Sequence, residues 1–149
     1  IQIRFIEFMP FDKNQWNSNK VVSLHEIMYA IENEFSEILP LARVKNSTAK
    51  EFKINGFKGT FAIISTMTAP FCGDCNRLRL TADGKMKNCL FSNSETDLLS
   101  AFRQGEDIRA LIDKNVASKK EALGGQINTN YQKIETSDLV NRSMVNIGG

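Results

Sequence analysis

The apolar positions divide the chain into a first part with one long strand and one helix and a second part with several short strands. Residues 1–9 are almost continuously apolar and β-prone, which is typical of a strand buried on both faces of a parallel sheet. A polar loop follows Pro10. Ser23 and Glu26 have the spacing of a capping box and predict the start of a helix. One apolar stripe is expected on it, made of Leu24, Ile27, Met28, Ile31 and Phe35.

A polar stretch without periodicity, residues 42–50, predicts a boundary, after which the pattern changes. Strands are predicted over 51–54, 60–67, 78–82 and 85–91, and the last two form a hairpin in which Asp83-Gly84 favours a type I′ turn. Helices are predicted from a cap at Ser94 or Thr96 to Gly105, and over 107–120. No element is expected beyond Leu123. The expected fold class is α/β changing to α+β, with domains at 1–45 and 46–149.

Charge and hydropathy exclude some classes of function. Nineteen basic and seventeen acidic residues give a net charge of +2, well short of the basic excess of a nucleic-acid binder. No apolar run approaches the roughly 18–20 residues of a membrane span, and no signal-peptide pattern opens the chain. Because the sequence starts at Ile1 inside an expected strand, we expect a piece of a longer intracellular protein.

Three cysteines carry the candidate chemistry. Cys72 and Cys75 share one tight Cys-Gly-Asp-Cys loop, and Cys89 returns on the far arm of the hairpin. Three clustered cysteines suit a metal in a reducing compartment better than a disulfide framework. An iron–sulfur cluster is favoured, with zinc and buried unreactive thiols as alternatives. His25, the only histidine, is the one candidate for a fourth zinc ligand.

Arg77 and Arg79 follow the second cysteine directly. Residues two apart in a strand share a face, so both guanidinium groups are expected to project together and could bind phosphate, although a solvated strand face is the alternative. A two-residue hairpin loop would place Cys89 opposite Leu78, on the order of 10 Å along the ladder from Cys75. The segment before Asn76 must then fold back, or a bulge must shift the register.

Several segments together resemble a known family. The run from Phe71 to Phe91 is similar to the cluster-binding segment of the molybdenum cofactor biosynthesis protein A family, the radical S-adenosylmethionine GTP 3′,8-cyclases. Residues 4–10 (RFIEFMP) resemble the family's sixth barrel strand, and residues 47–50 (STAK) resemble the segment leading into its C-terminal part. Ile147-Gly-Gly149 resembles its diglycine end. The resemblance therefore covers the whole chain.

The resemblance implies a site for each of these segments. Cys72, Cys75 and Cys89 would bind a [4Fe–4S] cluster whose open iron meets the purine of GTP. GTP would also contact Arg77, Arg79 and Arg4, and S-adenosylmethionine would contact Met9. The tail, Gly148 and Gly149, would reach into the active site. Residues 1–45 would be the last β–α unit of an incomplete radical (βα)6 barrel, and residues 46–149 the cluster-binding and GTP-binding region.

The resemblance also implies what lies outside this chain. In the family, a C-x3-C-x2-C loop holds a second [4Fe–4S] cluster that cleaves S-adenosylmethionine, and this sequence contains no such loop. The fragment alone is therefore expected to be an inactive part of a lyase. The full-length enzyme is expected to be a homodimer that passes its product to cyclic pyranopterin monophosphate synthase. Its compartment would be the mitochondrial matrix in a eukaryote or the cytoplasm in a bacterium.

Two readings from other classes stay open at the level of sequence. The cysteine spacing also fits a zinc-stabilised module that binds a protein or a nucleic acid. It fits, in addition, the auxiliary-cluster domain of a radical enzyme that acts on peptides. Metal content separates the first of these from the cyclase, and GTP binding separates the second.

Overall fold

The structure, a computed structural model, describes residues 1–127, 130–134 and 139–147. These residues form two compact units. The first contains Ile1–Met9 and Ser18–Cys75, and the second contains Pro10–Asn17 and Asn76–Gly149. The predicted tail residues Gly148 and Gly149 lie outside the described residues. The domain division expected at residue 45 stays a prediction.

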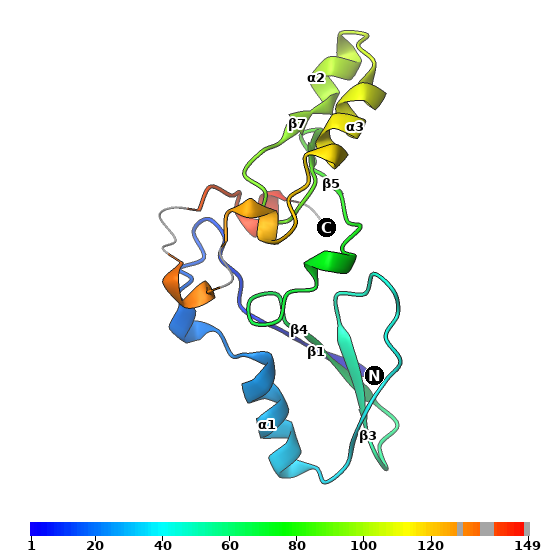
Figure 1. Cartoon of the computed structure of the whole chain (residues 1–149), viewed down its shortest axis with the longest axis vertical. Helices are drawn as coiled ribbons and strands as arrows, with labels where there is room; N and C mark the ends of the chain where they lie inside the picture. The colour runs from blue at the N-terminus through cyan, green and yellow to red at the C-terminus, as the bar shows by residue number, and fades with distance from the viewer. Residues whose placement is uncertain (128–129, 135–138, 148–149) are drawn as a thin grey trace. The chain divides into compact units, whose positions relative to one another are not determined.

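The first unit is built on a four-stranded mixed sheet, in the order β1-β4-β3-β2 (Figure 1). Its strands are β1 (Gln2–Ile6), β2 (Ile38–Pro40), β3 (Lys50–Ile54) and β4 (Thr60–Ile64). β1 pairs with β4 in parallel, whereas β2, β3 and β4 pair antiparallel. The parallel pairing predicted for the first strand is confirmed. The strands predicted over 51–54 and 60–67 are present as β3 and β4, which pair as a hairpin. β2 was not predicted, because three residues carry too little periodicity.

The predicted burial of the first strand on both faces is wrong for this chain. Among the described residues, β1 is an edge strand paired only with β4, and Ile3 and Ile6 are 58% and 55% exposed. The core lies instead on β4, where Ala62 and Ile63 are 0% exposed because neighbouring strands flank them on both sides. Apolar side chains on an open edge are an aggregation hazard unless another strand or layer covers them.

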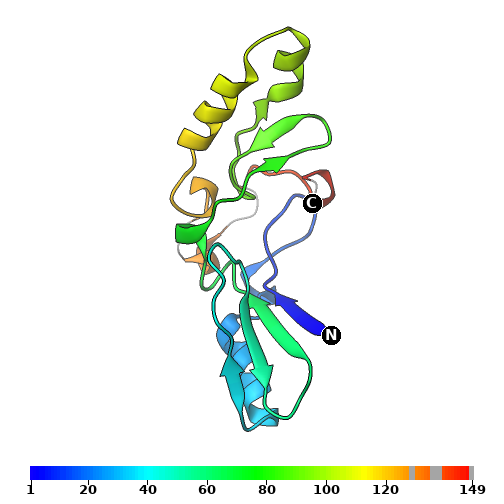
Figure 2. The ribbon, with the colours of Figure 1, turned by 90° about the vertical axis from the view of Figure 1, so that its right-hand side faces the viewer.

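α1 (Leu24–Glu34) begins with the predicted capping box. The Glu26 N–H donates to the Ser23 hydroxyl at 3.2 Å, and the Ser23 N–H donates to the Glu26 carboxylate at 2.8 Å. The hydrogen bonds from Ser23 lower the pKa of Glu26. Figure 2 shows α1 on one face of the sheet. Its apolar stripe is not fully buried, because a hollow of about 400 Å³ lies between Ile27 and Ile31 on α1 and Phe5 on β1.

The second unit combines a small antiparallel sheet with two helices (Figures 1 and 2). Its elements are β5 (Arg79–Leu80), β6 (Lys85–Lys87), β7 (Thr96–Asp97), α2 (Leu98–Arg103) and α3 (Ile108–Ala117). Both predicted helices are present. The α2 cap is neither Ser94 nor Thr96 but Asp97, whose carboxylate accepts from the Ser100 N–H at 2.9 Å. In the described ranges, no helix is long and apolar enough to cross a membrane.

The β5–β6 hairpin is present, but its predicted two-residue type I′ turn is wrong. The Gly84 N–H donates to the Thr81 carbonyl and the Thr81 N–H donates to the Lys85 carbonyl, so the loop has three residues. A three-residue hairpin loop consists of a type I turn followed by a residue in the left-handed region. Gly84, with a φ of +76°, is that residue. The register pairs Arg79 with Lys87, one residue away from the pairing expected of a two-residue turn.

The end of the chain has more structure than its pattern predicts. Short 3₁₀ turns occur at Leu123–Gly125, Tyr131–Lys133 and Met144–Asn146. The Gln126 side chain joins two parts of this region, because it donates to the Val140 carbonyl and accepts from the Val140 N–H, both at 3.0 Å. Side-chain hydrogen bonds of this kind have no hydrophobic period, so they cannot be predicted from the pattern of apolar residues.

Candidate metal centre and its supporting residues

Cys72 and Cys75 are presented by one 3₁₀ turn, Cys72–Asp74, at the end of the first unit. The Cys75 N–H donates to the Cys72 carbonyl at 3.0 Å, and the Asp74 N–H donates to the Phe71 carbonyl at 3.3 Å. Both side chains are partly exposed thiols. The turn therefore offers two soft ligands that lie three positions apart in the sequence.

An ion pair to Asp74 holds the solvent-exposed side of this turn. The Arg43 guanidinium lies 2.7 Å from the carboxylate of Asp74, the residue between Gly73 and Cys75. Both side chains are about half exposed, at 59% and 46%, so the pair contributes no more than about 1 kcal/mol. It links the polar 42–50 segment to the cysteine turn, a contact that the sequence pattern did not reveal.

Cys89 belongs to the second unit, two residues beyond the end of β6. Its carbonyl accepts from the Ser92 N–H at 3.2 Å, and its side chain is a partly exposed thiol. Among the described residues, no three His, Cys, Asp or Glu side chains form a preassembled metal site. The donor set itself is three reduced thiols, which fits the thiolate ligation of an iron–sulfur cluster.

The two predicted phosphate-binding arginines differ in their surroundings. Arg79 lies within β5 and is partly buried, whereas Arg77 precedes the strand and is exposed. The Lys119 ammonium, just beyond α3, donates to the Arg77 carbonyl at 2.9 Å and holds the backbone there. Arg79 is paired across the ladder with Lys87, so two cations occupy opposite positions on one face.

The two residues predicted on the first strand are both in the first unit. Arg4 is an exposed residue of β1, and its Nε donates to the Gln2 side-chain oxygen at 2.9 Å. Met9 lies three residues beyond the end of β1 and is partly buried. His25 lies in the first turn of α1 and is exposed.

Sequence reasoning missed a buried lysine beside Cys89. Lys87 is 1% exposed, and its ammonium donates to the Ser92 carbonyl at 2.6 Å and to the Asn141 side chain at 3.0 Å. Its nearest carboxylate oxygen, on Glu95, is 3.7 Å away. Burial lowers the pKa of Lys87, and the charge of Glu95 opposes that shift. Lysine is rarely buried without a partner, but nothing in the local pattern distinguishes Lys87 from Lys85, which is partly exposed.

Arg142 extends this network toward the β5–β6 loop. Its guanidinium donates to Asp83 at 2.8 and 3.1 Å, and its Nε donates to Glu95 at 2.6 Å. Its other bond to Glu95 completes a two-point contact with that carboxylate. Hydrogen bonds from Arg142 and Thr81 hold the pKa of Asp83 well below its usual range, and both carboxylates raise the pKa of Arg142.

The Arg142–Asp83 pair predicts an acid-dependent loss of stability. Because the pKa of Asp83 is lower in the folded state than in the unfolded state, its contribution is complete above about pH 5 and falls as Asp83 of the unfolded chain takes up a proton near pH 4. Asp83→Asn should therefore destabilise the protein at pH 6 and by less at pH 3. Urea unfolding at both pH values measures the difference. An equal effect at the two pH values would contradict the prediction.

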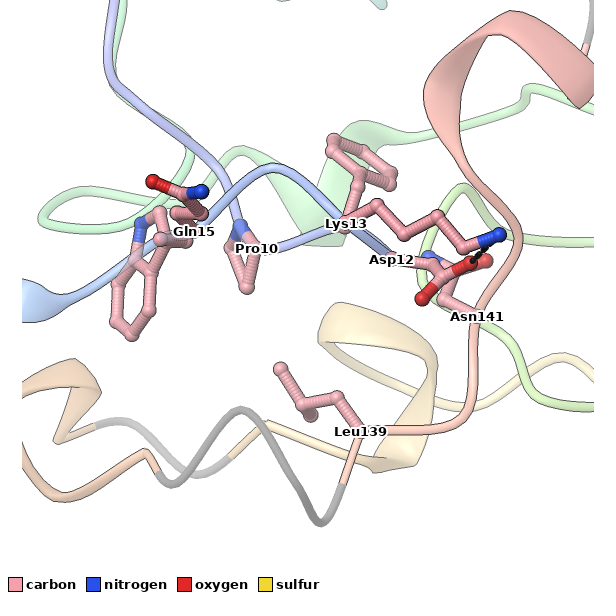
Figure 3. A pocket seen from close by; sticks show the side chains of 8 residues that line it. Pro10, Asp12, Lys13, Gln15, Leu139 and Asn141 are labelled. Carbon is pink, nitrogen blue, oxygen red and sulfur yellow. Dashed lines mark ion pairs between the residues drawn. The ribbon is translucent and has the colours of Figure 1, made fainter.

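A separate hollow of about 310 Å³ lies in the second unit (Figure 3). Residues Pro10, Asp12, Lys13 and Gln15 line it from one side, and Leu139 and Asn141 line it from the other. Lys13 and Gln15 have positive φ angles, of +63° and +52°, which are strained for residues with side chains. Of the sequence-predicted site residues that the structure describes, none lines this hollow.

Comparisons with known proteins agree with the motifs. A model of the family described as Molybdenum Cofactor Synthesis C matches residues 1–124. The chain is 43% identical over 136 residues to "Molybdenum cofactor biosynthesis protein 1" of Bos taurus, covering 89% of this chain and 22% of the relative. It is 41% identical over 152 residues to the mitochondrial GTP 3′,8-cyclase of Arabidopsis thaliana, covering 100% of this chain and 37% of the relative.

A bacterial relative extends the similarity. The GTP 3′,8-cyclase of Thermodesulfovibrio yellowstonii is 43% identical over 125 residues, covering 82% of this chain and 39% of the relative. In each of these three pairings the chain spans well under half of the relative's length. The sequence-based resemblance is therefore confirmed.

Proposed function

The chain belongs to the Molybdenum Cofactor Synthesis C family, and from this premise we propose that it is the C-terminal part of a GTP 3′,8-cyclase. In this proposal it holds an auxiliary [4Fe–4S] cluster and GTP during a step of molybdenum cofactor biosynthesis. The observation that carries the proposal is the family match over residues 1–124, a span that includes all three cysteines and both arginines.

In this proposal, each candidate residue of the chain has its own role. Thiolates of Cys72, Cys75 and Cys89 would hold the cluster, and their number would leave one iron without a cysteine ligand. When bound, that cluster would supply an open iron for a donor atom of the purine. Guanidinium groups of Arg77 and Arg79 would hold the triphosphate through charge-assisted hydrogen bonds. Arg4 would contact the substrate, and Met9 would contact S-adenosylmethionine.

The rest of the reaction would depend on the remainder of the full-length enzyme. β1 and α1 would be the last β–α unit of a radical (βα)6 barrel, whose other units would cover the exposed face of β1. Radical formation from S-adenosylmethionine would occur at a second cluster, so this part alone would be inactive. The full-length enzyme would be a homodimer and would pass its cyclised nucleotide to cyclic pyranopterin monophosphate synthase. A mitochondrial or cytoplasmic location stays a prediction.

Metal content tests the proposal directly. After anaerobic reconstitution of the full-length protein, about four irons with matching sulfide should reside on these three cysteines, in addition to the irons of the N-terminal cluster. Broad visible absorption should accompany the iron. Stoichiometric zinc without sulfide at these cysteines would instead indicate a structural zinc module.

The arginines give a second test, on the substrate. Replacing both Arg77 and Arg79 by Ala should weaken GTP binding by about 3 kcal/mol, since two sets of charge-assisted hydrogen bonds are removed. Isothermal titration calorimetry with GTP measures this loss. Arg109→Ala is the matched control, because Arg109 is an exposed arginine on α3 outside the proposed site. Unchanged GTP affinity in the double variant would refute the assigned role.

A further inference from the structure

Glu7 is a buried carboxylate with every oxygen engaged. It follows β1 directly and is 2% exposed. One carboxylate oxygen accepts from the Leu24 N–H at 2.9 Å and from the Thr68 hydroxyl. The other accepts from the N–H groups of Met67 and Thr68, at 2.7 and 2.9 Å. Burying a charged group is costly unless it is satisfied in this way.

The four donors come from two segments that are distant in sequence. Leu24 is the first residue of α1, where backbone N–H groups have no partner inside the helix and the helix dipole favours a negative charge. Met67 and Thr68 belong to the loop that follows β4. The Glu7 N–H donates to the Ile64 carbonyl at 3.1 Å, so Glu7 also continues the β1–β4 pairing. One side chain thus fixes β1, α1 and the β4 loop together.

The β4 loop leads straight to the cysteine turn. After Thr68, the Ala69 N–H donates to the Ser65 carbonyl at 3.2 Å, and the Ser65 hydroxyl donates to the Ala69 carbonyl at 3.1 Å. Pro70 and Phe71 follow, and then the turn at Cys72. Because Thr68 is only four positions before Cys72, an anchor at Thr68 restricts where the turn can lie within the first unit.

We propose that Glu7 is a positioning residue for the metal centre, acting through the β4 loop to hold the backbone that presents Cys72 and Cys75. The inference rests on the proposed function, since it takes these thiols to be cluster ligands. The capping box of Ser23 and Glu26 leaves the Leu24 N–H to Glu7, and that one backbone bond is all that Glu7 adds to the cap of α1. The two bonds to Met67 and Thr68 backbone N–H groups serve the loop instead.

The test replaces Glu7 by Gln in the full-length protein. The amide keeps one acceptor oxygen but turns an N–H₂ group toward at least one backbone N–H donor, so at least one hydrogen bond is lost. Hydrogen exchange over residues 65–75 should become about tenfold faster or more. Iron release from the auxiliary cluster to a chelator should accelerate by about the same factor. Glu26→Gln is the matched control at the same helix end, and it should leave both rates within about twofold of wild type.

Thr68 supplies a second pair of variants that leaves Glu7 in place. Thr68→Val removes only the hydroxyl donor and should accelerate iron release by a smaller factor, whereas Thr68→Ser should restore the wild-type rate. If Glu7→Gln and Thr68→Val retain iron as wild type does, the positioning role is overturned while the proposed function stands. If wild-type protein itself takes up no cluster at these cysteines, the proposed function fails and the inference fails with it.

Discussion

Replacement of Cys89 by Ser in the full-length protein should remove about four irons per chain, those of the proposed auxiliary cluster. A serine hydroxyl is a harder and far less acidic ligand than a thiol, and two remaining thiolates do not retain a cluster that needs three. Iron and acid-labile sulfide analysis after anaerobic reconstitution measures this loss. Cys72→Ser and Cys75→Ser should give the same result, because each would remove one of the three proposed ligands.

Ser94→Ala provides the control for the Cys89 prediction. Ser94 is exposed in the segment that follows Cys89, and only its backbone carbonyl has an assigned role, as the acceptor of the Ser92 hydroxyl. Its iron content should match that of wild type. The three-cysteine assignment would be wrong if Cys89→Ser kept its iron while Cys72→Ser and Cys75→Ser lost theirs. That outcome would point to two thiolates with another ligand.

The features that the sequence predicted are those that repeat or that occupy a fixed spacing. The capping box at Ser23 and Glu26, the strands β3 and β4 and the two helices of the second unit all follow from local rules. The closely spaced Cys72 and Cys75 indicate soft ligands because a short spacing brings two thiols to one turn. These features can be predicted because the residues that form each of them lie within a few positions of one another in the sequence.

The features that the sequence missed depend on partners far along the chain. Glu7 stands out from its strand as a charged residue, but its donors are 17, 60 and 61 positions away. The Lys87 ammonium donates to the side chain of Asn141, which is 54 positions further along the chain. The hairpin error is different, because Asp-Gly fits both a two-residue and a three-residue loop, and the hydroxyl of Thr81 selects the longer one by accepting from the Lys85 N–H at 3.0 Å.

Replacement of Glu95 by Gln should destabilise the protein by about 3 kcal/mol, the largest effect on stability that we expect from a single isosteric change. Glu95 is the carboxylate that Lys87 and Arg142 share, and Lys87 has almost no contact with solvent. Without the negative charge, the buried ammonium keeps only the neutral acceptors of Ser92 and Asn141. Urea unfolding at pH 7 measures the loss of free energy. Glu106→Gln, at an exposed position, should change stability by less than about 0.5 kcal/mol.

A double-mutant cycle identifies the cause of that loss. Lys87→Met keeps the length and apolar volume of the side chain but removes its charge, so it should cost less in the Glu95→Gln background than in wild type, by about 1 kcal/mol or more. The reason is that the second change removes the buried cation that the first left unpaired. If the two losses were simply additive, Glu95 would stabilise the fold through Arg142 alone. The cycle therefore decides whether the lysine beside Cys89 is held by charge or only by its hydrogen bonds to Ser92 and Asn141.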